Sequence, residues 1–211
     1  MKMFNWKIEY SITATIVFAV ILFFIPTSFS SKEAGYISKW NEKYNKIEYM
    51  FAAMSAQADS EIVKELKDET DNNKRKQLMI KLIQPYLRLS EVEYPKWRYH
   101  QRYMNGKTVS KKDFYYFDTL YKSPIGLIVG VKDVDDSPVE NLAFMMSVDV
   151  NGLKGPNMWG KDIYGVYIQK DGSVKALGYD KTIDELRKDC SASGSGVTCS
   201  HFYRIGGEFN E

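Results

Sequence analysis

Three oxygen-bearing side chains in one glycine-rich stretch have the clearest chemical potential in this sequence. The segment DVNGLKGPNMWGKD begins at Asp149 and ends at Asp162, and Asn151 follows the first aspartate by two positions. Hard oxygen ligands with alternate spacing are typical of the start of a calcium loop, although the distal glutamate of an EF-hand is absent. Alternatively, Asp149 and Asn151 cap turns through their own side chains, and we favour this interpretation. Calcium is therefore the one cofactor that the sequence suggests.

Two cysteines form a second candidate pair. Cys190 and Cys199 are separated by Ser-Ala-Ser-Gly-Ser-Gly-Val-Thr, and the chain contains no other cysteine. A zinc site would need further ligands, so we do not expect one. In an oxidising compartment the pair would close a small loop as a disulfide, and we predict this bond. The alternative is a reduced pair that lies nearby by chance.

A basic stretch follows Pro95. Six basic residues and no acid lie between Pro95 and Lys112, interleaved with tryptophan and tyrosine. Cations alternating with rings are typical of single-stranded nucleic-acid binding. The candidate contacts are Lys96, Arg98, Arg102 and Lys107. The same pattern arises when the aromatic residues enter a core and the basic residues stay solvated, which we favour.

Catalytic signatures are missing from the sequence. No HExxH, GxSxG or GxxxxGK[ST] motif is present, and neither His100 nor His201 has an evident partner. The formal net charge of +2 is too small to demand an anionic partner. We therefore predict that the chain is not an enzyme.

The N-terminal region predicts a membrane anchor. No charged residue lies between Tyr10 and Ser31, and a helix of that length would cover about 33 Å, enough to cross a bilayer core. Lys2 and Lys7 favour a cytoplasmic N-terminus. A cleaved signal peptide, with Ser28-Phe29-Ser30 as its small-residue site, remains the alternative.

An amphipathic helix is predicted directly after this anchor, because apolar residues recur in steps of three and four. They are Ile37, Trp40, Tyr44, Ile47, Phe51, Met54 and Ala58. A continuous helix from residue 9 to 58 would be a rod of about 75 Å, which Pro26 could kink or break.

Two features resemble type IV pilins and pseudopilins. Glu9 precedes Pro26 by seventeen positions within the hydrophobic segment, as in the N-terminal helix of that family. The segment from Asp149 to Asp162 is similar to one in the C-terminal sheet of pilin-like proteins, where it precedes a strand and a glycine turn. The resemblance implies that Glu9 and Pro26 serve assembly, and that other pilin-like subunits are partners through the N-terminal helix. It also implies a single-pass location in a bacterial cytoplasmic membrane.

The later sequence predicts an antiparallel sheet, since the period changes to two. The predicted strands are Phe114–Tyr121, Leu127–Val131, Ala143–Val150, Ile163–Ile168, Val174–Tyr179 and His201–Ile205. The predicted helices are Gln77–Leu89, ending at Pro85, and Thr182–Lys188. Asn105-Gly106 predicts a hairpin turn within Arg102–Val109.

The predicted fold is α+β, with a long N-terminal helix packed on a C-terminal antiparallel sheet. Its parts are an anchor over 1–31, a stalk helix over 32–58, a variable helical connection over 59–93 and a sheet domain over 94–211. We expect a structural subunit of a pilus or of a type II secretion apparatus. The alternatives are an extracytoplasmic protein that binds DNA or another ligand, and, less favoured, an anchored hydrolase.

Overall fold

A computed structural model describes residues 32–56, 69–92, 99–133 and 142–209 of the chain. The chain divides into two compact units, Met1–Gly35 and Tyr36–Glu211, and all contacts given below lie within the second unit. The predicted anchor, with Glu9 and Pro26, falls outside the described residues. Within the described ranges, no helix is both long enough and apolar enough to cross a bilayer.

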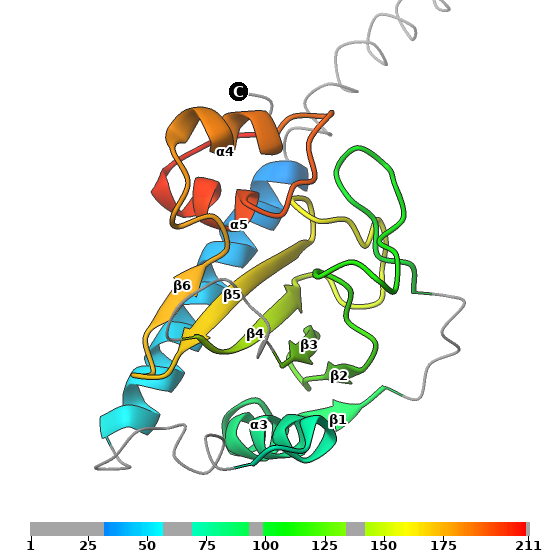
Figure 1. Cartoon of the computed structure of the whole chain (residues 1–211). Coiled ribbons are helices and arrows are strands. Elements are labelled where there is room, and N and C mark those ends of the chain that lie inside the picture. The colour runs from blue at the N-terminus through cyan, green and yellow to red at the C-terminus, as the bar shows by residue number, and fades with distance from the viewer. Residues whose placement is uncertain (1–31, 57–68, 93–98, 134–141, 210–211) are drawn as a thin grey trace, which may run out of the picture. The chain divides into compact units, whose positions relative to one another are not determined.

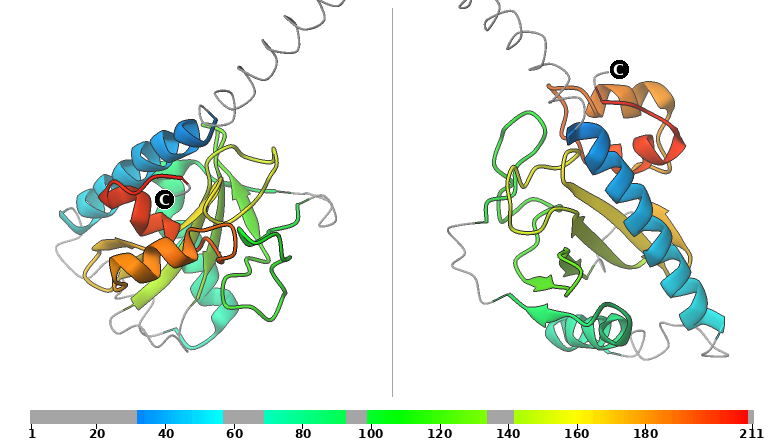
Figure 2. Two further views of the ribbon diagram at one scale, coloured as in Figure 1. Left: turned by 90° about the horizontal axis from the view of Figure 1, so that it is seen from above. Right: turned by 180° about the vertical axis from the view of Figure 1, so that it is seen from behind.

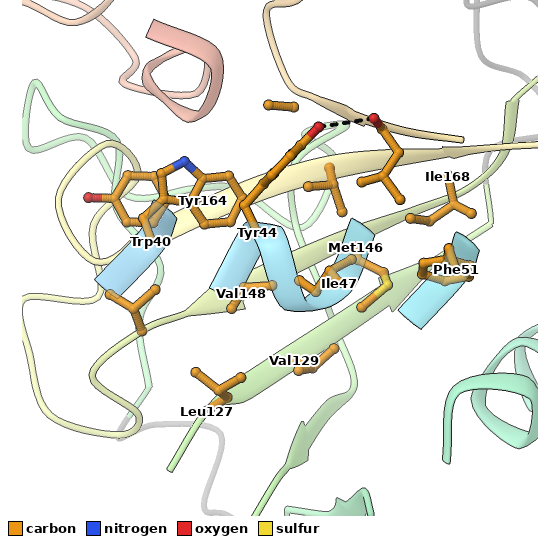
Figure 3. Close-up of a cluster of buried hydrophobic side chains, with 14 of the residues drawn as sticks. Trp40, Tyr44, Ile47, Phe51, Leu127, Val129, Met146, Val148, Tyr164 and Ile168 are labelled. Atoms are coloured by element: carbon orange, nitrogen blue, oxygen red, sulfur yellow. Dashed lines mark hydrogen bonds between the residues drawn. The ribbon is translucent and has the colours of Figure 1, made fainter. Parts of the chain in front are cut away.

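The helix over residues 32–56 is amphipathic, as its apolar periodicity predicts (Figure 3). Its buried stripe contains Trp40, Tyr44, Ile47, Met50, Phe51 and Met54; Ala58 lies outside the described residues. Trp40 stacks on Tyr164 with 4.8 Å between ring centroids. The indole N–H of Trp40 donates to the Ser200 carbonyl at 2.8 Å, and the hydroxyl of Tyr44 donates to the Val174 carbonyl at 3.0 Å. The polar atoms of the stripe are therefore satisfied as well as buried.

A six-stranded antiparallel sheet packs against this helix, with its strands in chain order (Figure 1). The strands are β1 (Ser90–Glu91), β2 (Leu120–Lys122), β3 (Ile128–Lys132), β4 (Leu142–Asp149), β5 (Ile163–Gln169) and β6 (Val174–Ala176). Each strand pairs only with its neighbours in sequence. This arrangement confirms the α+β class and the antiparallel sheet.

Both faces of the central strands are buried, since successive side chains of a strand point to opposite sides. Phe144, Met146 and Val148 of β4 join the hydrophobic cluster that contains the helix over 32–56. Met145 joins a second cluster, which the segment over residues 99–120 covers. Figure 2 shows the helix on one side of the sheet and the loops of that segment on the other. The sheet therefore lies between two layers.

Helix α3 (Asn72–Leu87) packs beside the first cluster, to which it contributes Met79 and Ile83. Its N-terminus is capped by Asp71, whose side chain accepts the N–H groups of Asn73 and Lys74. The observed helix begins at Asn72, before the predicted start at Gln77, and it continues past Pro85 to Leu87.

The predicted strand Phe114–Tyr121 is wrong over most of its length, because residues 111–119 form turns, bends and irregular backbone, and only Leu120–Lys122 pairs as β2. The aromatic residues here have high β-propensity, but Phe114, Tyr115 and Tyr116 all pack against the same second cluster. Consecutive side chains of a strand cannot share one face. The Asn105-Gly106 turn is present, with a single bridge between Arg102 and Thr108.

The predicted last strand His201–Ile205 is also wrong. These residues belong to helix α5 (Cys199–Phe202) and to the 3-10 helix η1 (Tyr203–Ile205). Phe202 and Tyr203 are neighbours in sequence and both are buried in the first cluster, which helical geometry allows and strand alternation does not. Helix α4 (Ile183–Asp189) confirms the predicted short helix, and Thr182 and Glu185 form its capping box.

Candidate functional site: the loop between β4 and β5

The predicted oxygen-bearing residues lie at the end of β4 (Asp149) and in the loop over residues 150–162 that follows it. Strands β4 and β5 pair with Asp149 opposite Ile163, so the two ends of the loop meet. The backbone N–H of Val150 donates to the carbonyl of Asp162 at 2.9 Å. This register brings Asp149 and Asp162 together although they lie far apart in sequence.

Asp162 holds the second half of the loop in a tight turn. Its Oδ1 accepts the N–H of Met158 at 2.6 Å, and its Oδ2 accepts the N–H of Asn157 at 2.9 Å. Asn157 has a left-handed backbone with φ +52°, a conformation that asparagine tolerates better than most residues. Asp162 has no exposed surface, and burial raises its pKa to about 6.

Asp149 holds the first half of the loop. Its Oδ1 accepts the N–H of Asn151 at 3.0 Å, which is the side-chain turn that the favoured interpretation predicts. Its Oδ2 accepts the hydroxyl of Tyr99 at 2.9 Å. Burial raises the pKa of Asp149 well above its usual range, and the charge of Asp162 adds to this effect. Burial also raises the pKa of Tyr99.

Asn151 completes the cluster. Its Nδ2 donates to the Gly155 carbonyl at 3.2 Å and to the hydroxyl of Tyr36 at 3.3 Å. Its Oδ1 is buried and accepts no hydrogen bond in the part of the chain that the structure describes. The side chain also opposes the effect of burial on the pKa of Asp162. All three residues predicted from the sequence therefore gather at one place.

The cluster offers a cation two carboxyl groups and one amide oxygen. Calcium needs six to eight oxygen ligands, and the described residues contain no group of three or more acidic, histidine or cysteine side chains that could hold a metal. Each carboxyl oxygen already accepts a hydrogen bond from the protein. A cation here would therefore need backbone carbonyls or water as additional ligands, and the calcium site stays a prediction.

Two glycines let the loop approach neighbouring segments. Gly152 has φ +74°, and a Cβ there would lie 2.8 Å from the carbonyl oxygen of Gly126. Gly160 has φ +78°, and a Cβ would lie 2.9 Å from Sγ of Cys199. A side chain at either position would both strain the backbone and collide. The loop is thus fitted against the β2–β3 turn and the C-terminal disulfide.

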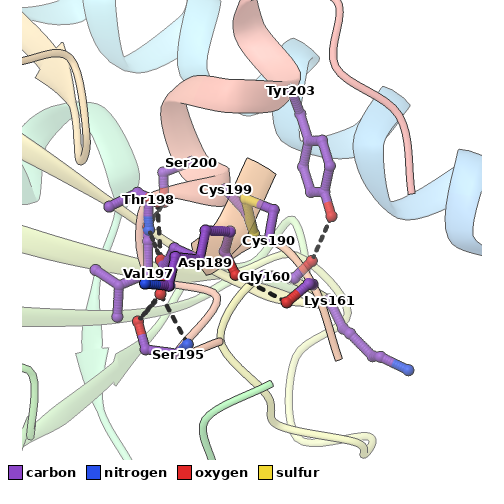
Figure 4. Close-up of a disulfide and its surroundings, with 12 residues drawn as sticks. Gly160, Lys161, Asp189, Cys190, Ser195, Val197, Thr198, Cys199, Ser200 and Tyr203 are labelled. Carbon is purple, nitrogen blue, oxygen red and sulfur yellow. Dashed lines mark hydrogen bonds between the residues drawn. A yellow bond between two sulfur atoms is a disulfide. The ribbon is translucent and has the colours of Figure 1, made fainter. Parts of the chain in front are cut away.

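Cys190 and Cys199 form the predicted disulfide (Figure 4). The loop that they close is also held by Asp189. Its Oδ1 accepts the backbone N–H and the hydroxyl of Ser195 at 2.7 and 2.6 Å, and its Oδ2 accepts the same two groups of Thr198 at 2.9 and 2.8 Å. Burial acts to raise the pKa of Asp189, but these bonds outweigh it and lower the pKa.

The basic stretch divides between core and solvent. Lys96 and Arg98 lie outside the described residues, while Arg102 and Lys107 are exposed. Tyr99 and Tyr103 are partly buried against the second cluster, and the hydroxyl of Tyr103 donates to Asp113 at 3.2 Å. This arrangement agrees with the interpretation favoured from the sequence, in which the aromatic rings enter the core and the basic side chains remain solvated.

A small cavity beside Tyr99 was not predicted from the sequence. Its volume is about 110 Å³, and its lining includes Tyr99, Gln101, Glu91 and Asp118. Gln101 is only 5% exposed; its Nε2 donates to the Phe117 carbonyl at 2.9 Å, and its Oε1 accepts no hydrogen bond within the described ranges. In the sequence, Gln101 stands alone among basic and aromatic residues, and no pattern there predicts a cavity. The cavity can accept a small hydrogen-bond donor such as water or an ammonium group.

Comparison of the chain with protein families, with curated proteins and with solved structures found no match.

Proposed function

We propose that this chain is a pilin-like structural subunit of a bacterial pilus or of a type II secretion apparatus, anchored in the cytoplasmic membrane. One observation carries the proposal. In the sequence, the uncharged segment from Tyr10 to Ser31 runs directly into the helix over residues 32–56. The apolar stripe of that helix is buried on an antiparallel sheet. An anchor followed by such a helix suits a subunit that assembles through its N-terminal segment and exposes its sheet domain.

The C-terminal region supports an extracytoplasmic location for the sheet domain. Cys190 and Cys199 are bonded, and disulfides persist mainly in oxidising compartments. In a bacterium that compartment lies outside the cytoplasmic membrane. The +2 net charge and the packed aromatic rings of the basic stretch give nucleic acid less support as the principal partner.

Membrane fractionation combined with intact-mass measurement tests the anchor. We expect the protein in the membrane fraction, released by detergent and not by high salt or carbonate, with a mass that retains residues 10–31. Val20→Arg should move the protein to the soluble fraction or stop its export, because a charge at mid-bilayer is costly. Val20→Leu is the matched control. A soluble protein that lacks residues 1–30 would contradict the proposal and favour a secreted binding protein.

Assembly through the anchor has its own test. Glu9→Gln should leave membrane insertion intact and reduce co-purification of differently tagged copies, because a carboxylate in an apolar helix needs a partner. Lys7→Gln is the control on the same segment. Unchanged co-purification in Glu9→Gln would remove the assembly role of this glutamate.

Nucleic-acid binding is a second candidate function, favoured by the exposure of Arg102 and Lys107. Its test is retention of single-stranded DNA by the purified full chain at increasing salt. Binding that falls steeply with salt and with Arg102→Ala would support it, whereas salt-independent or absent retention would dismiss it.

A further inference from the structure

Exposed large hydrophobic side chains gather at two separate places in the sheet domain. Among the described residues, six such side chains are exposed, and three of them, Tyr49, Tyr86 and Ile125, line one groove. Two others lie close together in sequence: Tyr179 is on the turn that leads into α4, and Ile183 is the first residue of α4. Single exposed hydrophobics need no explanation, but a contiguous group marks an interaction surface.

The groove lies between the helix over residues 32–56, the end of α3 and the turn before β3. Its volume is about 230 Å³, and its lining includes Met50 as well as Tyr49, Tyr86 and Ile125. A void of roughly 150 Å³ accepts a benzene ring, so the groove can take one or two large side chains. Its polar lining comes from Lys43 and Lys46. Both lysines pair with the single acid Glu42, so this edge of the groove retains a positive charge.

Residues 179–185 form the turn before α4 and the first residues of that helix, and they are here called the knob. Their charge is opposite to that of the groove edge. The apolar side chains of the knob are Tyr179 and Ile183, which are 37% and 45% exposed. Asp180, Asp184 and Glu185 lie beside them in sequence, and Lys181 pairs with Asp180 at 3.2 Å, so Asp184 and Glu185 leave this region with a negative charge. The ring of Tyr179 is held edge-on to Tyr167 at 6.3 Å between centroids. The knob is therefore an apolar projection with an acidic border, held in place before any contact is made.

The groove and the knob cannot meet within one molecule. In Figure 1 and in the right-hand view of Figure 2, α4 lies at one end of the sheet domain and α3 at the other. Complementary surfaces at opposite ends of one molecule create a heterologous contact, which propagates from copy to copy instead of closing as a symmetric dimer.

We infer that the groove receives the knob of a second copy of this chain. Ile183 and Tyr179 enter the apolar groove, and the acids of the knob face Lys43 and Lys46. The inference rests on the proposed function, because it supplies a contact between sheet domains in an assembly whose anchors pack in the membrane. Apolar burial provides the stabilisation, and the charges select the partner and its orientation.

Photo-cross-linking in the full-length chain tests this contact. A photoreactive residue is placed at position 183, and the protein is expressed in membranes as a mixture of isotope-labelled and unlabelled copies. We expect cross-links from position 183 to peptides with residues 43–54 or 125 of another copy, with mixed labels. A photoreactive residue at position 205 is the matched control, because Ile205 is equally exposed and belongs to neither surface. Absence of the cross-link from 183, or a cross-link from 183 to 183, would overturn the inference.

Charge exchange supplies the second readout. Lys46→Glu and Asp184→Lys should each lower the cross-link yield at least fivefold, and the double variant should restore it, because like charges across a contact repel. Asp184 lies outside the capping box, so the fold of α4 is retained. Single variants without effect, or a double variant without rescue, would contradict the pairing.

The same samples separate the two proposals. Intact protein in the membrane fraction without the cross-link removes the contact and leaves the anchored-subunit proposal standing. A soluble, cleaved protein that still gives the cross-link with charge rescue removes the anchor and leaves the contact standing.

Discussion

Asp162 and Asp189 are two aspartates that hold loops closed, and their electrostatics are opposite. Asp162 is fully buried and accepts two backbone N–H groups, and burial raises its pKa to about 6. Asp189 is only partly buried and accepts two N–H groups and two hydroxyls. Against the effect of burial, those bonds lower its pKa. Backbone N–H groups and the Asn151 side chain also favour the charged form of Asp162, so the difference lies in burial. The loss of water outweighs the hydrogen bonds at the fully buried Asp162, whereas the hydrogen bonds prevail at the partly buried Asp189.

The largest expected effect is on how stability depends on pH, which should differ between Asp162 and Asp189. The folded state binds the Asp162 proton more tightly than the unfolded state does, so this contribution to stability is fully present below about pH 4 and is lost as the pH rises through about 6. The shift from 3.8 to about 6 corresponds to about 3 kcal/mol. In Asp162→Asn this dependence should be absent. The free energy of unfolding of the wild type, relative to this variant, should therefore fall by about 3 kcal/mol between pH 3 and pH 7.

Asp189→Asn is the control for this experiment, and it has the opposite sign. The pKa of Asp189 is lowered, so its contribution is present above the unfolded value and is lost as the pH falls below it. Urea denaturation at pH 3, 4, 5.5 and 7 measures both variants. If the free energies of unfolding of Asp162→Asn and of the wild type differed by the same amount at every pH, the predicted electrostatic difference between Asp162 and Asp189 would be wrong.

Loss of the disulfide is expected to have the next largest effect. Replacing both Cys190 and Cys199 by serine should lower the free energy of unfolding by about 2.5 kcal/mol, because the unfolded chain loses a closed loop of ten residues. Reduction of the wild type should produce the same change, which serves as the control. Labelling of both cysteines in the native, unreduced protein would contradict the bond.

Removal of the Asp189 carboxylate tests whether the hydrogen bonds or the disulfide hold the C-terminal loop. Asp189→Ala should cost about 2 kcal/mol, because partly buried N–H groups of Ser195 and Thr198 lose their acceptor. Asp184→Ala, on the exposed side of the same helix, should change stability by less than about 0.5 kcal/mol. Urea denaturation gives both values. The amide protons of Ser195 and Thr198 should also exchange faster in Asp189→Ala. Unchanged exchange would show that the disulfide alone holds the loop in place.

The smallest effect concerns the partner of Asp149. Tyr99→Phe should cost about 1 kcal/mol, because it deletes the hydroxyl that donates to Oδ2. That bond lowers the pKa of Asp149 against burial, so the variant should raise this pKa further. Carboxyl titration by NMR measures the shift, and exposed Tyr49→Phe is the control. An unchanged or lower pKa in Tyr99→Phe would show that the bond does not stabilise the charged carboxylate.

The regular elements could be predicted from the sequence because their apolar periods are clear. The stripe from Ile37 to Met54 has the helical period, and the runs that became β3, β4 and β5 are apolar and bounded by glycine, aspartate or asparagine. The predictions that failed, Phe114–Tyr121 and His201–Ile205, rested on aromatic content without alternation. Aromatic residues suit strands and equally cover a core from a loop or a short helix, and tertiary packing decides between them.

The candidate site was only partly predictable. Asp149, Asn151 and Asp162 could be selected because one glycine-rich segment contains them all. The role of Tyr99 as the donor to Asp149 depends on a contact across fifty residues, for which local sequence has no signal. The four donors of Asp189 were missed as well, since serines and threonines beside cysteines resemble an ordinary flexible loop.

The bond between the Trp40 indole and the Ser200 carbonyl joins residues 160 positions apart, whereas every strand of the sheet pairs with its neighbour in the chain. A ribosome makes Ser200 long after Trp40. The sheet can therefore form strand by strand as the chain emerges, since its contacts are local, while the buried face of the helix over residues 32–56 lacks part of its cover until the segment around Ser200 has been made. During that interval the helix exposes apolar surface that a chaperone or a neighbouring nascent chain can bind. The segment around Ser200 thus finishes the packing of a helix whose residues are made much earlier.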